Sequence, residues 1–112
     1  MYNRGDSRCG AGVSQLTNAQ RKFLKQQAHH LSPLLQIGKG GASPQVVQSL
    51  AQALAAHELV KVKFVALKRE KREVCATLAH ATGSDLITII GNVALFFRQN
   101  EDQAVRVVKL PA

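Results

Sequence analysis

The sequence predicts a single α/β (α+β-like) domain in which three helices pack on a mixed, mainly four-stranded sheet. Three observations predict this class. Strand-like apolar runs alternate with helical patterns, the last two runs are joined as a hairpin, and 112 residues suffice for one hydrophobic core without disulfides or metal. The expected order is helix, strand, helix, strand, helix, strand, strand, with right-handed crossovers between neighbouring parallel strands.

The first 14 residues differ in composition from the rest of the chain. They are rich in glycine, serine and charged residues and have neither helical nor strand periodicity. We therefore expect a flexible N-terminal tail over residues 1–14 and one folded domain over residues 15–112.

A first helix is predicted from Thr17 to about His30. Thr17 and Gln20 have the spacing of a capping box, and Ser32-Pro33 ends the helical pattern. One half of the helical wheel is apolar and contains Ala19, Phe23, Leu24, Ala28 and Leu31. A separate arc of the wheel, the first basic arc, contains Arg21, Lys22 and Lys25, with His29 beside them. This arc is a candidate contact surface, and an ordinary solvated helix face is the alternative.

A glycine-rich turn of the GxxG type, Gly38–Gly41, follows a predicted strand at Leu34–Ile37. After the turn, Ser43 can cap a second helix that starts at Pro44 and ends near His57. This helix has no basic residue before its last position, so we expect it to pack on the sheet and to present its N-terminus.

The GxxG turn has the properties of a phosphate-binding loop. Glycines without a Cβ allow the backbone to lie close to a ligand, the amides at a helix start attract anions, and a lysine adds positive charge. The candidate ligand contacts are Gly38, Lys39, Gly40 and Gly41. A tight connection without any ligand is the alternative for this short motif.

The next strand is predicted at Leu59–Val65, with Lys61 and Lys63 on its polar face. A third helix is predicted to open with Lys68–Glu73 and to end at Gly83 as C-terminal cap. Its expected buried face consists of Val74, Cys75, Leu78 and Ala81. The second basic arc consists of Lys68, Arg69 and Arg72. Basic residues at a helix start oppose the helix dipole, which favours a partner over a purely structural role, although surface ion pairing is the alternative.

The last two strands form the clearest local pattern. Leu86–Ile90 and Val93–Arg98 are separated by Gly91-Asn92, which is typical of a two-residue hairpin turn with glycine first. A short edge strand over Val105–Leu110 is a further possibility before Pro111.

The net charge of +8 points to an anionic partner, either a nucleic acid or a membrane surface. The two cysteines, Cys9 and Cys75, have no metal-binding spacing, so we expect no zinc and no other cofactor. They also make no disulfide framework, which fits a reducing cytoplasm. No signal peptide and no membrane span is recognisable. If the partner is a nucleic acid, stacking on bases is a poor candidate because aromatic residues are few, which favours recognition of the shape or backbone of the nucleic acid.

Several segments, in this order, resemble the CRM domain (chloroplast RNA splicing and ribosome maturation), and within that family the stand-alone bacterial YhbY-like RNA-binding proteins. They are the helix with the first basic arc, the GxxG turn, Glu58–Lys63, Thr82-Gly83, Ile90-Gly91 and Phe97-Arg98. The resemblance covers about residues 16–110 and leaves the tail outside.

The resemblance implies a fold similar to the C-terminal domain of bacterial translation initiation factor three. It also implies RNA binding through Gly38, Lys39, Gly40 and Gly41 and through the basic surface at Arg21, Lys22 and Lys25. Stand-alone members associate with precursors of the large ribosomal subunit, so rRNA in such particles is the implied partner. Lys68, Arg69 and Arg72 are added from charge and helix phase alone. We expect a monomer that binds neither a membrane nor a small-molecule substrate.

Two other functions compete with RNA binding. The first is an RNA-acting enzyme, a nuclease that would use the histidines His29, His30, His57 and His80. No carboxylates accompany these histidines, so we expect no enzymatic activity. The second is a basic module that binds a protein or an anionic lipid, but no helix has the broad aromatic face of an interfacial helix.

Overall fold

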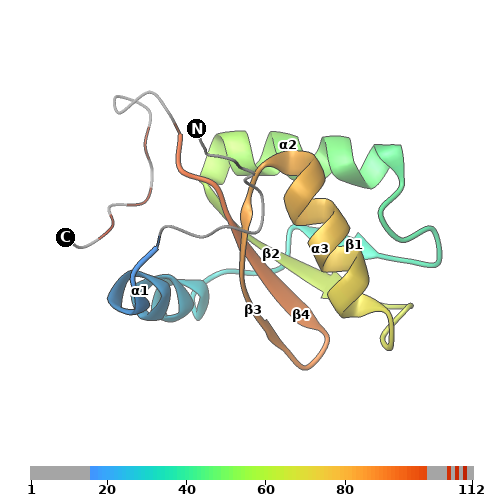
Figure 1. The fold of residues 1–112 in the computed structure, drawn as a ribbon, viewed down its shortest axis with the longest axis horizontal. Helices are drawn as coiled ribbons and strands as arrows, with labels where there is room; N and C mark the ends of the chain where they lie inside the picture. The colour runs from blue at the N-terminus through green and yellow to red at the C-terminus, as the bar shows by residue number, and fades with distance from the viewer. Residues whose placement is uncertain (1–15, 101–105, 107, 109, 111–112) are drawn as a thin grey trace.

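This computed structural model describes residues 16–100 together with residues 106, 108 and 110. The predicted tail therefore lies outside the described residues. Three helices and four strands follow the predicted order (Figure 1). They are α1 (Asn18–Ala28), β1 (Leu35–Ile37), α2 (Pro44–His57), β2 (Leu59–Phe64), α3 (Lys71–Thr82), β3 (Asp85–Ile90) and β4 (Val93–Phe97).

The four strands form one mixed sheet in the order β1-β2-β4-β3. β1 and β2 are parallel and are connected through α2, whereas β4 is antiparallel to both of its neighbours. The predicted mixed four-stranded sheet with three helices is thereby confirmed. None of the helices in the described part of the chain is long and apolar enough to cross a membrane.

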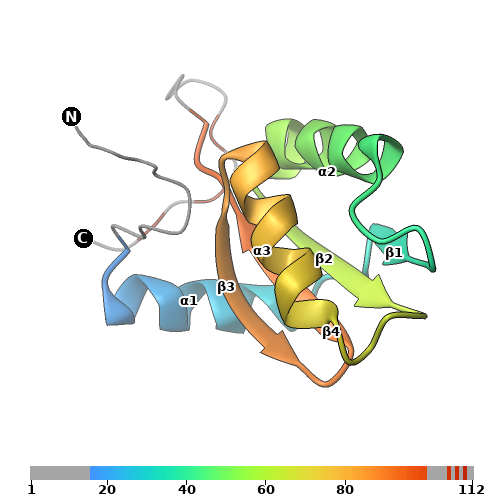
Figure 2. The ribbon, with the colours of Figure 1, turned by 45° about the vertical axis from the view of Figure 1, so that its right-hand side comes forward.

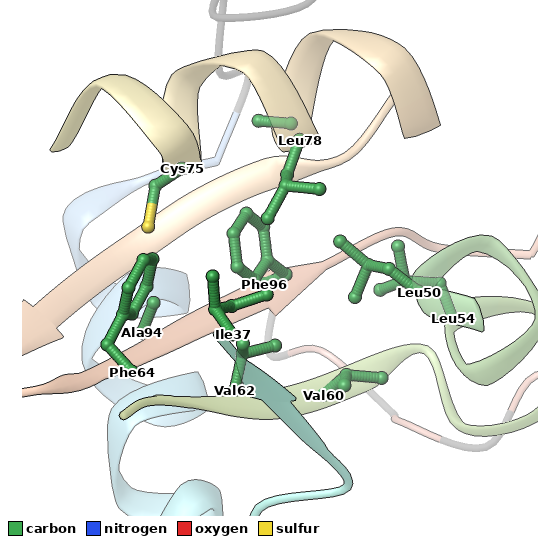
Figure 3. Close-up of a cluster of buried hydrophobic side chains, with 11 residues drawn as sticks. Ile37, Leu50, Leu54, Val60, Val62, Phe64, Cys75, Leu78, Ala94 and Phe96 are labelled. Atoms are coloured by element: carbon green, nitrogen blue, oxygen red, sulfur yellow. The ribbon is translucent and has the colours of Figure 1, made fainter. Parts of the chain in front are cut away.

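The helices cover both faces of the sheet (Figure 2). α2 and α3 lie on one face, where Leu50 and Leu54 of α2 and Cys75 and Leu78 of α3 pack with Phe96 of β4 (Figure 3). α1 lies on the opposite face, where its buried side chains meet the other side of the same strands. This second cluster consists of Leu24, Ala28, Leu59, Ile87, Leu95 and Phe97.

Local signals in the sequence account for the element ends. Thr17 and Gln20 form the predicted capping box, with both hydrogen bonds at 3.0 Å. The Ser43 hydroxyl accepts a hydrogen bond from the Val46 amide at the start of α2. Gly83 ends α3 with φ of 65°, in the left-handed region that glycine adopts without strain.

The predicted start of the third helix was wrong. Lys68 and Arg69 lie in a turn before α3, which begins at Lys71. Leu67 has φ of 55°, and the Glu70 amide donates to the Leu67 carbonyl oxygen at 3.1 Å, so the chain turns once before the helix can start. The second basic arc is therefore not one helix face.

Two further predictions about α3 and the C-terminal residues need correction. Ala81 is exposed, and Ala79 and Thr82 are buried in its place, because the sheet contacts a slightly rotated face of α3. Of the possible strand at 105–110, residues 106, 108 and 110 are described, and none of the three belongs to a strand. The other residues of that segment lie outside the described residues.

Candidate nucleic-acid interface

Parallel pairing of β1 and β2 places the two loops that follow them at the same edge of the sheet (Figure 1). Ile37, the last residue of β1, pairs with Phe64, the last residue of β2. The GxxG turn follows the first strand and leads into α2, and residues 65–70 follow the second strand and lead into α3. We call this side of the molecule, with both loops and both helix N-termini, the loop edge.

The two loops contact each other directly. The Ile37 carbonyl oxygen accepts hydrogen bonds from the Val65 and Ala66 amides at 3.0 and 3.2 Å. Gly41 is buried against the Leu67 side chain, and its own amide donates to the Gly38 carbonyl oxygen at 3.1 Å. The GxxG turn is thus packed on the segment that carries Lys68 and Arg69.

Gly41 is required for this packing, whereas Gly38 and Gly40 are not. Gly41 has φ of 60°, and a Cβ there would lie 3.1 Å from Cδ1 of Leu67. Apart from the adjacent residues, no atom of the described part of the chain lies within 4 Å of a Cβ built at Gly38 or Gly40. The open sides of these two glycines allow a ligand backbone to approach the turn.

We expect Gly41→Ala to lower the free energy of unfolding by about 1–2 kcal/mol, the cost of a left-handed non-glycine residue. Gly40→Ala, the matched control, should leave it within about 0.5 kcal/mol of the wild-type value. Urea unfolding followed by circular dichroism measures both. Equal stability of the two variants would contradict the structural role of Gly41.

The loop edge gathers four exposed cationic side chains. Lys39 comes from the GxxG turn, Lys68 and Arg69 come from the following loop, and Arg72 comes from the first turn of α3. Lys71 instead points to the hairpin, where its Nζ donates to the Gly91 carbonyl oxygen. The GxxG turn and the second basic arc are therefore neighbours in space, and their roles as RNA contacts stay predictions.

The first basic arc lies on the other face of the sheet, on α1, and its three residues differ. Nη2 of Arg21 donates to the carbonyl oxygens of Leu86 and Ile87 at 3.1 and 3.3 Å. These carbonyls lie on edge strand β3 where the register with β4 shifts. Arg21 thus anchors α1 to the sheet, whereas Lys22 and Lys25 are exposed.

Arg21 also acts on a neighbouring carboxyl group. Burial raises the pKa of Asp85, and the positive charge of Arg21 lowers it in part. The hydrogen bonds to β3 and the charge interaction with Asp85 give the Arg21 guanidinium a structural role. The number of cationic residues on the helix does not reveal this role. The role of Arg21 in RNA binding stays a prediction. Its side chain is less exposed than those of Lys22 and Lys25.

Lys63 is not among the site residues predicted from the sequence. The strand register places it in a row across all four strands, on the α1 face but beside the loop edge. This row consists of Gln36, Lys63, Val93 and Ile90. Gln36, Lys63 and Ile90 are exposed. The alternating pattern of β2 predicts that Lys63 lies on the polar face of the strand. The structure adds that α1 does not cover this part of the face, so Lys63 is exposed.

The described residues contain no group of three or more His, Cys, Asp or Glu side chains that could hold a metal ion. Burial raises the pKa of the Cys75 thiol to about 11, so the thiol is neutral near pH 7 and is a poor nucleophile or ligand. His30 and His57 line one groove together with Lys61, and no carboxylate is among its described lining residues.

Comparison with known proteins gives consistent matches over most of the chain. "Probable RNA-binding protein YqeI" of Bacillus subtilis is 34% identical over 97 residues, which is 86% of this chain and 99% of that protein. "Probable RNA-binding protein PA4753" of Pseudomonas aeruginosa is 38% identical over 86 residues, which is 76% of this chain and 83% of that protein.

A solved structure shares the fold. The solution structure of the hypothetical protein SAV1595 from Staphylococcus aureus matches with a TM-score of 0.72 and 32% identity, over 86% of this chain and 99% of that one. The family model of the CRS1 / YhbY (CRM) domain matches residues 16–98, which contain every helix and strand described above. The chain therefore belongs to the CRS1/YhbY (CRM) domain family.

Proposed function

We propose that this chain is a non-enzymatic RNA-binding protein that contacts structured rRNA through the loop edge and associates with precursors of the large ribosomal subunit. The observation that carries the proposal is the meeting of the GxxG turn with Lys68 and Arg69 at the N-termini of α2 and α3. Membership of the CRM family and the names of the relatives support the RNA part of it.

The loop edge suits a sugar-phosphate backbone for two physical reasons. Helix N-termini carry partial positive charge and unpaired amides, and two such ends lie beside exposed lysine and arginine side chains. Contacts of this kind hold phosphates without reading bases, so binding should depend on RNA shape and fall with rising salt. The large-subunit particle rests on the family resemblance, and a monomeric state and a cytoplasmic site of action are further parts of this proposal.

Sedimentation of a cell lysate through a sucrose gradient tests the proposal. The tagged chain is expected to migrate with large-subunit precursors and to move to the top of the gradient after RNase treatment. Migration only with small-subunit particles would contradict the proposed particle. Migration that survives complete RNA digestion would contradict RNA contact and indicate a bound protein instead.

A further inference from the structure

The sheet face that carries α1 also contains a groove that the function proposed above does not use. The groove has a volume of about 310 Å³ and lies between the C-terminal half of α1 and the hairpin of β3 and β4. Its polar side consists of Lys25 of α1, His29 directly after α1, and Lys61 of β2. No acidic side chain is among its described lining residues.

The floor of the groove is apolar and accessible. Ile90 is 67% exposed, more than the other exposed large hydrophobic residues in the described part of the chain, and Val93 lies beside it as its cross-strand partner. Nζ of Lys61 donates to the Leu31 carbonyl oxygen, three residues past the end of α1, at 3.1 Å, and an ammonium group has two further N–H donors. An apolar floor under a cationic side matches a ligand with a flat apolar part and a negative charge.

A row of paired residues across the sheet connects the groove with the loop edge. Ile90 and Val93 begin the row that crosses the sheet through Lys63 to Gln36, and Gly38 follows two residues later in the chain. With neighbouring strands about 4.8 Å apart, the row spans roughly 14 Å from β3 to β1. One RNA strand can therefore contact the groove and the GxxG turn together.

We propose that this groove binds one unpaired nucleotide of the RNA, with the base on Ile90 and Val93 and the phosphate at Lys25 and Lys61. The proposal rests on RNA binding at the loop edge and adds to it a contact with a base. A phosphate alone would leave the apolar floor exposed to water, whereas a base covers it. No aromatic side chain is among the described lining residues of the groove, so we expect the contact to favour an unpaired nucleotide only modestly and to discriminate little between bases.

Two RNA probes test the inference, a short duplex with one bulged uridine and the same duplex fully paired. The wild-type protein is expected to bind the bulged duplex about 5-fold more tightly, which corresponds to about 1 kcal/mol. Ile90→Ser should remove this preference and leave the affinity for the paired duplex unchanged. Leu34→Ser is the matched control, because Leu34 is another exposed aliphatic residue, at 53%, that lies outside this groove.

Fluorescence anisotropy measures the affinities, and circular dichroism verifies that both serine variants are folded. Equal wild-type affinity for the two duplexes, or a preference that survives Ile90→Ser, overturns the inference and leaves RNA binding at the loop edge intact. Failure of the wild-type protein to bind either duplex overturns both. The ratio of the two affinities thus separates the groove from the loop edge.

Discussion

Glu58→Ala is expected to lower the free energy of unfolding by about 3 kcal/mol, because its carboxylate is fully buried and holds two distant backbone amides. One carboxylate oxygen accepts from the Asn100 amide at 2.5 Å and the other accepts from the Val108 amide at 2.8 Å. Val108 and Leu110 pack on the cluster under α1. The substitution therefore leaves two amides without their acceptor and loosens this packing.

The backbone of Glu58 provides an internal control. Glu58 has φ of 64° and ψ of −42°, outside the regions that non-glycine residues prefer. Glu58→Gly also removes the carboxylate but relieves this strain, so it should be more stable than Glu58→Ala by about 1 kcal/mol. Glu58→Gln retains an acceptor oxygen and should lose less than Glu58→Ala does.

Chemical unfolding of the three variants measures these differences. In Glu58→Ala, hydrogen exchange of the Asn100 and Val108 amides should become faster than in the wild-type protein. This acceleration should be larger than that of the amides in the cluster under α2 and α3. Wild-type stability of Glu58→Ala would show that the carboxylate does not hold the C-terminal residues. Equal stability of the alanine and glycine variants would contradict the backbone strain.

Combined substitution of Lys39, Lys68 and Arg69 by alanine is expected to weaken rRNA binding about 100-fold at low salt. Each phosphate contact that is removed reduces the number of counterions released on binding. The slope of log K against log salt should therefore become shallower by about 2–3. All three side chains are exposed, so the fold should be retained. Filter binding of an rRNA fragment over a range of salt concentrations measures both quantities.

A charge-matched control separates the loop edge from overall charge. Gln48, Gln52 and Ala56 are exposed on α2, which has no basic residue before His57. Their combined substitution by glutamate lowers the net charge by three, the same change as the alanine triple variant. We expect a much smaller loss of affinity for this control. Equal losses in the two triple variants would mean that net charge, and not the loop edge, determines binding.

Much of the fold follows from local patterns in the sequence. Three local signals involve only a few consecutive residues each: the capping box at Thr17, the Ser43-Pro44 helix start and the Gly91-Asn92 hairpin. The sequence therefore predicts them without knowledge of tertiary contacts. The start of α3 was misplaced because Leu67 takes a left-handed backbone conformation where it packs beside Gly41. That contact joins two loops distant in sequence and gives no local signal.

By itself, the sequence determined the types and order of the elements, the position of the GxxG turn between a strand and a helix, and the basic character of the chain. Hydrophobic periodicity and capping residues are local properties, which is why they suffice for these features. The tertiary structure alone decided which charges share a surface. Parallel pairing of β1 and β2 brings Lys68 and Arg69 to the GxxG turn, and the register of β3 engages Arg21 with backbone carbonyls. Strand order and register depend on contacts between distant residues, and these fix the candidate interface.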